Sequence, residues 1–263
     1  MSLARTCFTL SRPEPPSDPP SRPGTGKTVT IVEAIRQLLR QNPGVRILAC
    51  APSNSAADLI AEKLAGSLSP DELFRFYAPS RPKEAASSKL MDHTHQYQGT
   101  FGAPPMSRMT RFKVIVSTCV SASIFHGIGM VRGHFGYIFV DEAGQATEPE
   151  VMIAVKTMAD KSTRVILSGD HKQLGPIIRS NIARALGLET SYLERLMSRD
   201  GYEEVEGFGI RFLNSSIPAT KSAHYFVLAS LSSSKTSGPM NQSSTSLTKG
   251  STEEISKLRL RAE

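Results

Sequence analysis

The stretch GTGKTVTIVEAIRQLL, residues 24–39, joins a glycine-rich turn to a helical pattern, and it decides the fold. The two glycines allow consecutive backbone N–H groups to curl around phosphate oxygens, and the start of a helix adds positive potential there. Apolar residues then recur at helical spacing from Val32 to Leu39. The stretch predicts a phosphate-binding turn in which Lys27 reaches the β- and γ-phosphates and Thr28 ligates Mg²⁺.

Continuous apolar runs alternate with helical patterns after this first helix. This alternation predicts an α/β fold with a parallel sheet that helices cover on both faces. Each run leads into a polar motif at its carboxyl end, which is the edge where open α/β sheets bind ligands. The runs are VRILACA (45–51), FKVIVST (112–118), GYIFVDEA (136–143) and TRVILSGD (163–170).

Two of these polar motifs carry residues suited to nucleotide chemistry. Asp141 and Glu142 follow an apolar run, where one carboxylate can hold a Mg²⁺ ion and the other can activate a water molecule. We assign the metal to Asp141 and the catalytic base to Glu142. In GDHKQLGP (169–176), Gln173 is placed to sense a γ-phosphate. A glycine turn or a pair of acids has ordinary structural explanations, but the order of the three motifs favours one nucleotide site.

The chain divides into three regions by composition. Residues 1–22 are proline-rich and are expected to be disordered, residues 23–200 carry the α/β pattern, and residues 201–263 form a serine-rich tail. Loop-like residues 66–110 interrupt the α/β pattern, and the tail contains one apolar patch, HYFVLAS (224–230). The net charge of +7 is compatible with a polyanionic partner. No apolar run is long enough to span a bilayer, so we expect no membrane partner and a cytoplasmic location.

The ordered motifs resemble those of superfamily 1 helicases of the Upf-like group. The resemblance covers roughly residues 23–200 and rests on GTGKT, APSNSAAD (51–58), STCVSASI (117–124), DEAGQ and GDHKQLGP. Three further stretches look similar to the Moloney leukaemia virus ten-like RNA helicases, the group that includes Armitage. They are FRFYAPSR (74–81), DEAGQATEPE (141–150) and GLETSYLERLMSR (187–199).

The resemblance implies a RecA-like domain that binds ATP and Mg²⁺ and grips single-stranded RNA by its backbone. Residues 66–110 would be an inserted subdomain flanking the RNA channel. The family unwinds RNA with 5′-to-3′ polarity and serves RNA silencing in cytoplasmic ribonucleoprotein granules, with silencing ribonucleoproteins as partners. The implied nucleotide contacts are Gly24, Thr25, Gly26, Lys27, Thr28 and Gln173, with Thr28 and Asp141 on the metal and Lys27, Glu142 and Gln173 in catalysis. The implied RNA contacts are Pro52, Ser53, Asn54, Ser117 and Thr118.

The sequence departs from the family pattern before the phosphate turn. Ser21 and Arg22 stand where Gly-Pro is expected, which costs about 1–2 kcal/mol if Ser21 adopts a positive φ. Prolines also precede the turn, and proline cannot donate to a sheet ladder. RTCFTL (5–10) could form a strand, but a proline-rich connection separates it from Gly24. We therefore expect the sheet to be incomplete at its N-terminal strand.

A second RecA-like domain is not recognisable after LERLMSR (193–199). In this family that domain supplies an arginine finger, which is worth about 10³–10⁵ in rate. We therefore expect this chain alone not to unwind RNA. Two interpretations stay open: an ATP-dependent RNA helicase motor domain, or a non-catalytic truncated fragment that binds nucleotide or RNA weakly. A P-loop kinase or transporter ATPase is disfavoured, because neither calls for DEAGQ together with GDHKQLGP.

Overall fold

The structure is a computed structural model that describes residues 27–170 and 175–198 and the strands at 202–205, 210–213 and 224–229. All of these residues belong to one compact unit, Pro20–Ser232. The helices are α1 (Lys27–Gln41), α2 (Asn54–Ala65), α3 (Met106–Met109), α4 (Ser123–Gly127), α5 (Glu148–Met158), α6 (Asn181–Ala185) and α7 (Tyr192–Met197), with 3₁₀ turns η1 (Lys83–Ala85) and η2 (Ser88–His93). Within the described residues, no helix is both long and apolar enough to cross a bilayer.

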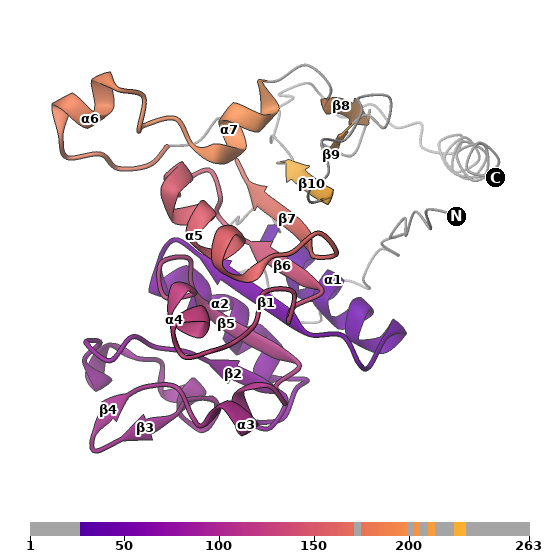
Figure 1. The fold of residues 1–263 in the computed structure, drawn as a ribbon, viewed down its shortest axis with the longest axis vertical. Coiled ribbons are helices and arrows are strands. Elements are labelled where there is room, and N and C mark those ends of the chain that lie inside the picture. Colours follow the sequence, from indigo (N-terminus) through magenta and orange to yellow (C-terminus); the bar gives the residue numbers. More distant parts are fainter. Residues whose placement is uncertain (1–26, 171–174, 199–201, 206–209, 214–223, 230–263) are drawn as a thin grey trace, which may run out of the picture. The chain divides into compact units, whose positions relative to one another are not determined.

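A mixed sheet runs through the unit, and its inner strands are parallel (Figure 1). The order among the described strands is β2-β5-β1-β6-β7-β10-β9-β8. A separate two-stranded ribbon pairs β3 with β4. The strands are β1 (Ile47–Ala51), β2 (Leu73–Arg75), β3 (Gln96–Tyr97), β4 (Thr100–Phe101), β5 (Val114–Thr118), β6 (Tyr137–Val140), β7 (Arg164–Gly169), β8 (Tyr202–Val205), β9 (Ile210–Leu213) and β10 (His224–Ala229).

Helices cover both faces of the inner strands, as the unbroken apolar runs predict. Every residue of β1 is buried. Leu48 and Cys50 belong to a core cluster that also contains Phe125 of α4, Val151 of α5 and Leu193 of α7. Because side chains alternate along a strand, the other residues of β1 face the opposite layer, where α2 packs on β1 and β5 and contacts α1. The prediction of an α/β domain with a parallel sheet covered on both faces is confirmed.

The helix starts show how local sequence sets the boundaries. Thr147 caps α5 by accepting a hydrogen bond from the Glu150 N–H, while the Glu150 carboxylate accepts from the Thr147 N–H at 2.8 Å. The cap of α2 is Ser53, whose hydroxyl accepts from the Ala56 N–H at 3.2 Å. The spacing of Ser55 and Asp58 also resembles a capping box, but the structure instead uses Asp58 in an ion pair described below.

The sheet continues beyond β7 into the serine-rich region. β10 lies parallel to β7, from His224 opposite Arg164 to Ala229 opposite Gly169, and β9 and β8 follow in antiparallel order. The sequence predicts disorder from residue 201, and the structure differs in these strands. An uncovered β7 would leave backbone N–H and C=O groups unpaired, which explains why the one apolar patch of the tail becomes a strand. The strand suggested at residues 5–10 lies outside the described residues.

The region 66–110 also differs from a loop-like insertion. Leu73–Arg75 is an edge strand of the main sheet, parallel to β5, with Leu73 opposite Val114. The turns η1 and η2, the β3-β4 ribbon and the short helix α3 follow it. The first part of this region therefore belongs to the α/β sheet, and the elements outside that sheet begin after β2.

A buried arginine fastens this edge strand to helix α2. Arg75 is 0% exposed and donates from Nε to Asp58 Oδ1 at 2.7 Å and from Nη2 to Asn54 Oδ1 at 3.0 Å. Its guanidinium also lies over the Tyr77 ring, 4.2 Å from the centroid, and the Tyr77 hydroxyl donates to Asp58 Oδ1 at 2.9 Å. Burial raises the pKa of Tyr77 to about 12, so the phenol keeps the proton that it donates. The network holds the first turns of α2 against β2.

Replacing Arg75 tests this network. We expect Arg75→Met to lower the free energy of unfolding by about 3–5 kcal/mol, because the Asp58 carboxylate is left without its buried partner. Arg108→Met is the matched control, since Arg108 pairs with Asp71 at 3.5 Å on the surface and such pairs contribute about 0–1 kcal/mol. Urea unfolding of the two variants measures the difference. Equal losses for both variants would contradict the assigned role of Arg75.

Candidate functional site

The start of α1 and the end of β6 meet at the carboxyl edge of the sheet. The Thr28 hydroxyl donates to Asp141 Oδ2 at 2.8 Å, although 113 positions separate the two residues. Thr28 lies in the first turn of α1, and Asp141 directly follows β6. The structure thus brings together the two residues that the sequence assigns to one metal ion.

Asp141 is held in a single orientation at the sheet edge. It is 1% exposed, and its backbone N–H donates to the Cys50 carbonyl at 2.9 Å. Its Oδ1 accepts from the Glu142 N–H at 3.0 Å, and the Ser168 side chain also bonds it. Burial raises the pKa of Asp141, and the hydrogen bonds from Thr28, Glu142 and Ser168 oppose that shift. The carboxylate is thus costly to ionise there but surrounded by groups that favour the ionised form.

Glu142 adopts a backbone conformation that is rare for a residue with a side chain. Its φ is 52°, in the left-handed region, which costs about 1–2 kcal/mol for a non-glycine residue. Gln145 stabilises this turn, since its backbone N–H donates to the Glu142 carbonyl at 2.9 Å and its Nε2 donates to Glu142 Oε2 at 3.1 Å. Burial, followed by the charge of Asp141, raises the pKa of Glu142, and Lys27 opposes the shift. A raised pKa makes the carboxylate a better proton acceptor.

Two glycines let the loop after β6 approach the loop after β7. A Cβ atom on Gly169 would lie 2.7 Å from the Gly144 nitrogen and 2.9 Å from Leu193 Cδ2. A Cβ atom on Gly144 would lie 2.6 Å from the Asp170 carbonyl oxygen. Only glycine allows these backbones to touch, and the Ala143 N–H donates to the Ser168 carbonyl at 2.7 Å across the gap. The start of the loop after β6 therefore packs directly against the end of β7 and Asp170.

The predicted RNA contacts lie at the neighbouring strand ends. β1 pairs with β5 so that Ala51 is opposite Thr118, and Pro52, Ser53 and Asn54 follow directly. Ser53 is exposed, whereas Pro52, Asn54 and Thr118 are half-buried. The Thr118 hydroxyl donates to Ser121 Oγ at 2.8 Å.

Ser117 differs from the other predicted RNA contacts. It is 0% exposed, and its hydroxyl donates to the Thr118 carbonyl at 3.0 Å. In this conformation its side chain has no surface to offer a strand, because it faces the core near Cys50. Thr118 and Ser121 are half-buried at this end of β5 and keep partly accessible side chains, and a motif comparison alone does not separate them from the buried Ser117.

Several predicted site residues lie outside the described part of the chain. Gly24, Thr25 and Gly26 of the phosphate turn precede it, and Gln173 falls in the gap at 171–174. The structure adds Ser168, which sequence reasoning missed. Its only signal is a hydroxyl near the end of the apolar run TRVILSGD (163–170).

The donor atoms at the sheet edge fit a hard divalent cation with a phosphate. A hydroxyl and a carboxylate oxygen lie 2.8 Å apart, and oxygen ligands of these types are the ones that Mg²⁺ prefers. Burial raises the pKa of both Asp141 and Glu142, and the charge of Lys27 opposes both shifts, so its ammonium group acts on the same edge. Thr28 and Asp141 could hold the metal, Lys27 a phosphate and Glu142 a water molecule.

Comparison with known proteins gives one family match and several similar helicases. A family described as "AAA domain" matches residues 14–103 and 106–181. The chain is 44% identical over 202 residues to human RNA helicase Mov10l1, covering 76% of this chain and 16% of that protein. It is 48% identical over 183 residues to putative helicase mov-10-B.1 of Danio rerio, covering 68% and 18%. It is 34% identical over 206 residues to probable RNA helicase armi of Drosophila melanogaster, covering 69% and 17%.

The tight packing of the two loops predicts a severe effect of a small substitution. We expect Gly169→Ala to lower the free energy of unfolding by about 1–3 kcal/mol, because a methyl group would press on the backbone of the loop after β6. Gly127→Ala is the control, since a Cβ atom there meets nothing within 4 Å. Thermal unfolding of both variants measures this difference. The close approach is refuted if Gly169→Ala unfolds at the same temperature as the parent protein.

Proposed function

The chain belongs to the AAA-domain family of superfamily 1 RNA helicases that includes the Mov10l1, MOV-10 and Armitage proteins, and from this premise we propose that it binds and hydrolyses ATP with Mg²⁺ while gripping single-stranded RNA. The contact between Thr28 and Asp141 carries the proposal. It joins the Thr28 hydroxyl in the first turn of α1 to the Asp141 carboxylate just after β6, at the edge where α/β sheets bind ligands.

Each residue at the edge has a separate task. A bound Mg²⁺ would supply positive charge that offsets the negative charge of the phosphates. Thr28 and Asp141 would hold the metal, and Lys27 would hold the β- and γ-phosphates. Glu142 accepts a proton from the attacking water, a task for which its raised pKa suits it. Gln145 keeps the Glu142 carboxylate in place through its bond of 3.1 Å.

The RNA would cross the neighbouring strand ends. Exposed Ser53 and half-buried Asn54 and Thr118 offer hydroxyl and amide groups to a sugar-phosphate backbone. Such contacts position a strand without reading its sequence. The buried Ser117 is left out of this set.

The chain spans about a sixth of the length of the curated relatives that it matches. Unwinding with 5′-to-3′ polarity, silencing ribonucleoproteins as partners and residence in cytoplasmic granules are therefore proposals for a protein of the relatives' full length. For residues 1–263 alone we propose low hydrolytic activity, because an arginine finger from a second domain is worth about 10³–10⁵ in rate. The alternative is a chain that binds nucleotide or RNA weakly and does not hydrolyse ATP.

Hydrolysis of ATP by the purified chain, with and without single-stranded RNA, tests the proposal. We expect slow, RNA-stimulated hydrolysis that Glu142→Gln lowers by about 10²-fold or more, since the substitution removes the proton acceptor. Because the pKa of Glu142 is raised, its base form is lost as the pH falls through that pKa. The rate should therefore decline on the acid side at a higher pH than for an ordinary glutamate.

The stability of the variant serves as the control. The raised pKa means that the Glu142 charge costs stability above that pKa, so Glu142→Gln should unfold at or above the parent temperature at neutral pH. Lost activity together with a preserved fold assigns Glu142 to the chemistry. RNA-independent hydrolysis that survives Glu142→Gln contradicts the proposal, and nucleotide binding without hydrolysis supports the alternative.

A further inference from the structure

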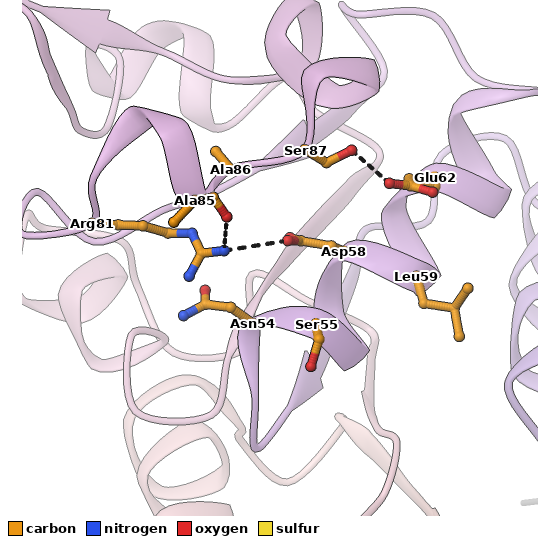
Figure 2. A pocket seen from close by; sticks show the side chains of 9 residues that line it. All are labelled: Asn54, Ser55, Asp58, Leu59, Glu62, Arg81, Ala85, Ala86 and Ser87. Atoms are coloured by element: carbon orange, nitrogen blue, oxygen red, sulfur yellow. Dashed lines mark hydrogen bonds and ion pairs between the residues drawn. The ribbon is translucent and has the colours of Figure 1, made fainter.

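A polar groove lies beside the proposed RNA path, between α2 and the segment around η1 (Figure 2). Its volume is about 610 Å³, enough for a nucleobase in an open setting. Successive turns of α2 form one wall, and the segment around η1 forms the other. The lining residues are Asn54, Ser55, Asp58, Leu59 and Glu62 on α2, with Arg81, Ala85, Ala86 and Ser87 opposite.

The groove begins where the proposed RNA contacts end. Asn54 belongs to both places, because it directly follows Ser53 and lines the groove. Arg75 binds Asn54 Oδ1 at 3.0 Å and so fixes the amide group, with its NH₂ as the remaining donor. A strand that crosses residues 52–54 therefore passes the mouth of the groove, and a base turned out from that strand can enter it.

The α2 wall offers mainly hydrogen-bond acceptors. Glu62 Oε1 accepts from the Ser87 hydroxyl at 2.5 Å, and Oε2 lies 4.0 Å from the exposed Lys89 ammonium. Asp58 Oδ2 lies 3.7 Å from Arg81 Nη2, a distance beyond a good hydrogen bond. The two carboxylates would repel a phosphate placed here, and they offer no donor to the O4 atom of uracil. An exocyclic amino group, in contrast, can donate to these carboxylates.

The remaining walls suit the flat faces and the ring acceptors of a base. Leu59 is 44% exposed and presents an apolar surface, which Ala85 and Ala86 continue from the other side. Arg81 points across the groove toward Asp58 (Figure 2). Its guanidinium is the donor opposite the carboxylates; Nη2 also donates to the Ala85 carbonyl, and the buried Nε has no hydrogen-bond partner among the described residues. Cytosine matches this arrangement, with an amino donor beside ring nitrogen and carbonyl acceptors.

We propose that this groove holds one base of the bound RNA and prefers a base with an exocyclic amino group, cytosine over uracil. The proposal rests on the RNA binding inferred above and adds a base preference to a backbone grip. Glu62 is the residue that discriminates, because its Oε2 is the acceptor least engaged by other groups.

Fluorescence anisotropy with oligocytidine and oligouridine of about ten nucleotides tests the preference, at one fixed salt concentration. These two pyrimidines differ at position 4, an amino group against a carbonyl. We expect the chain to bind oligocytidine at least about threefold more tightly than oligouridine. The difference should be smaller than that given by a fully buried bidentate hydrogen-bond pair, because the groove is open. Glu62→Gln should abolish the preference, since its amide can donate to the uracil carbonyl.

Two further variants complete the test. Glu84→Gln makes the same change on an exposed residue of the segment around η1 that does not line the groove, and it should keep the preference. Ala86→Leu fills the groove without changing charge, and it should make both affinities equal. Equal binding of the two oligonucleotides by the parent chain overturns the groove proposal but leaves backbone binding intact. Failure to bind either oligonucleotide overturns the RNA-binding proposal itself, and the base preference with it.

Discussion

The hydrogen bond from Thr28 to Asp141 is the contact on which the proposed site depends. It requires the start of α1 and the end of β6 to lie together, and the parallel pairing of β6 with β1 and β7 places that point at the carboxyl edge of the sheet. Once this edge is set, Glu142 and Ser168 follow from their positions in the chain. Burial opposes the ionised form of Asp141, and the hydrogen bonds around it favour that form. These opposing effects are what the proposed cation site relies on.

The sequence predicts this part of the molecule well because the signals are local and repeated. Unbroken apolar runs indicate strands buried on both faces, and polar residues at their ends indicate the functional edge. Thr28, Asp141 and Glu142 could be assigned from such patterns, and the structure brings them to one place. Ser117 shows the limit, because strand alternation turns its side chain into the core while motif similarity gives it the same weight as Thr118.

The features that the sequence does not reveal depend on long-range pairing. Arg75 looks like one more charged residue in an apolar stretch, and only the packing of β2 against α2 makes it a buried link to Asp58. The strand β10 forms because β7 offers an unpaired edge, which composition cannot show. The groove along α2 likewise needs two segments that lie some thirty positions apart in the chain. The propensities of single residues and the spacing of motifs carry no information on contacts between segments that are distant in the chain.

The most direct test of this account is a double-mutant cycle on the affinity for a fluorescent ATP analogue, measured with and without Mg²⁺. The account predicts that Mg²⁺ strengthens binding of the analogue to the parent chain. Thr28→Ala and Asp141→Asn should each lower the ratio of the affinities with and without Mg²⁺ by about tenfold or more. Because both residues serve one metal ion, the double variant should lose little more than either single one. Fully additive losses, or parent binding that ignores Mg²⁺, would contradict a shared metal site at this edge.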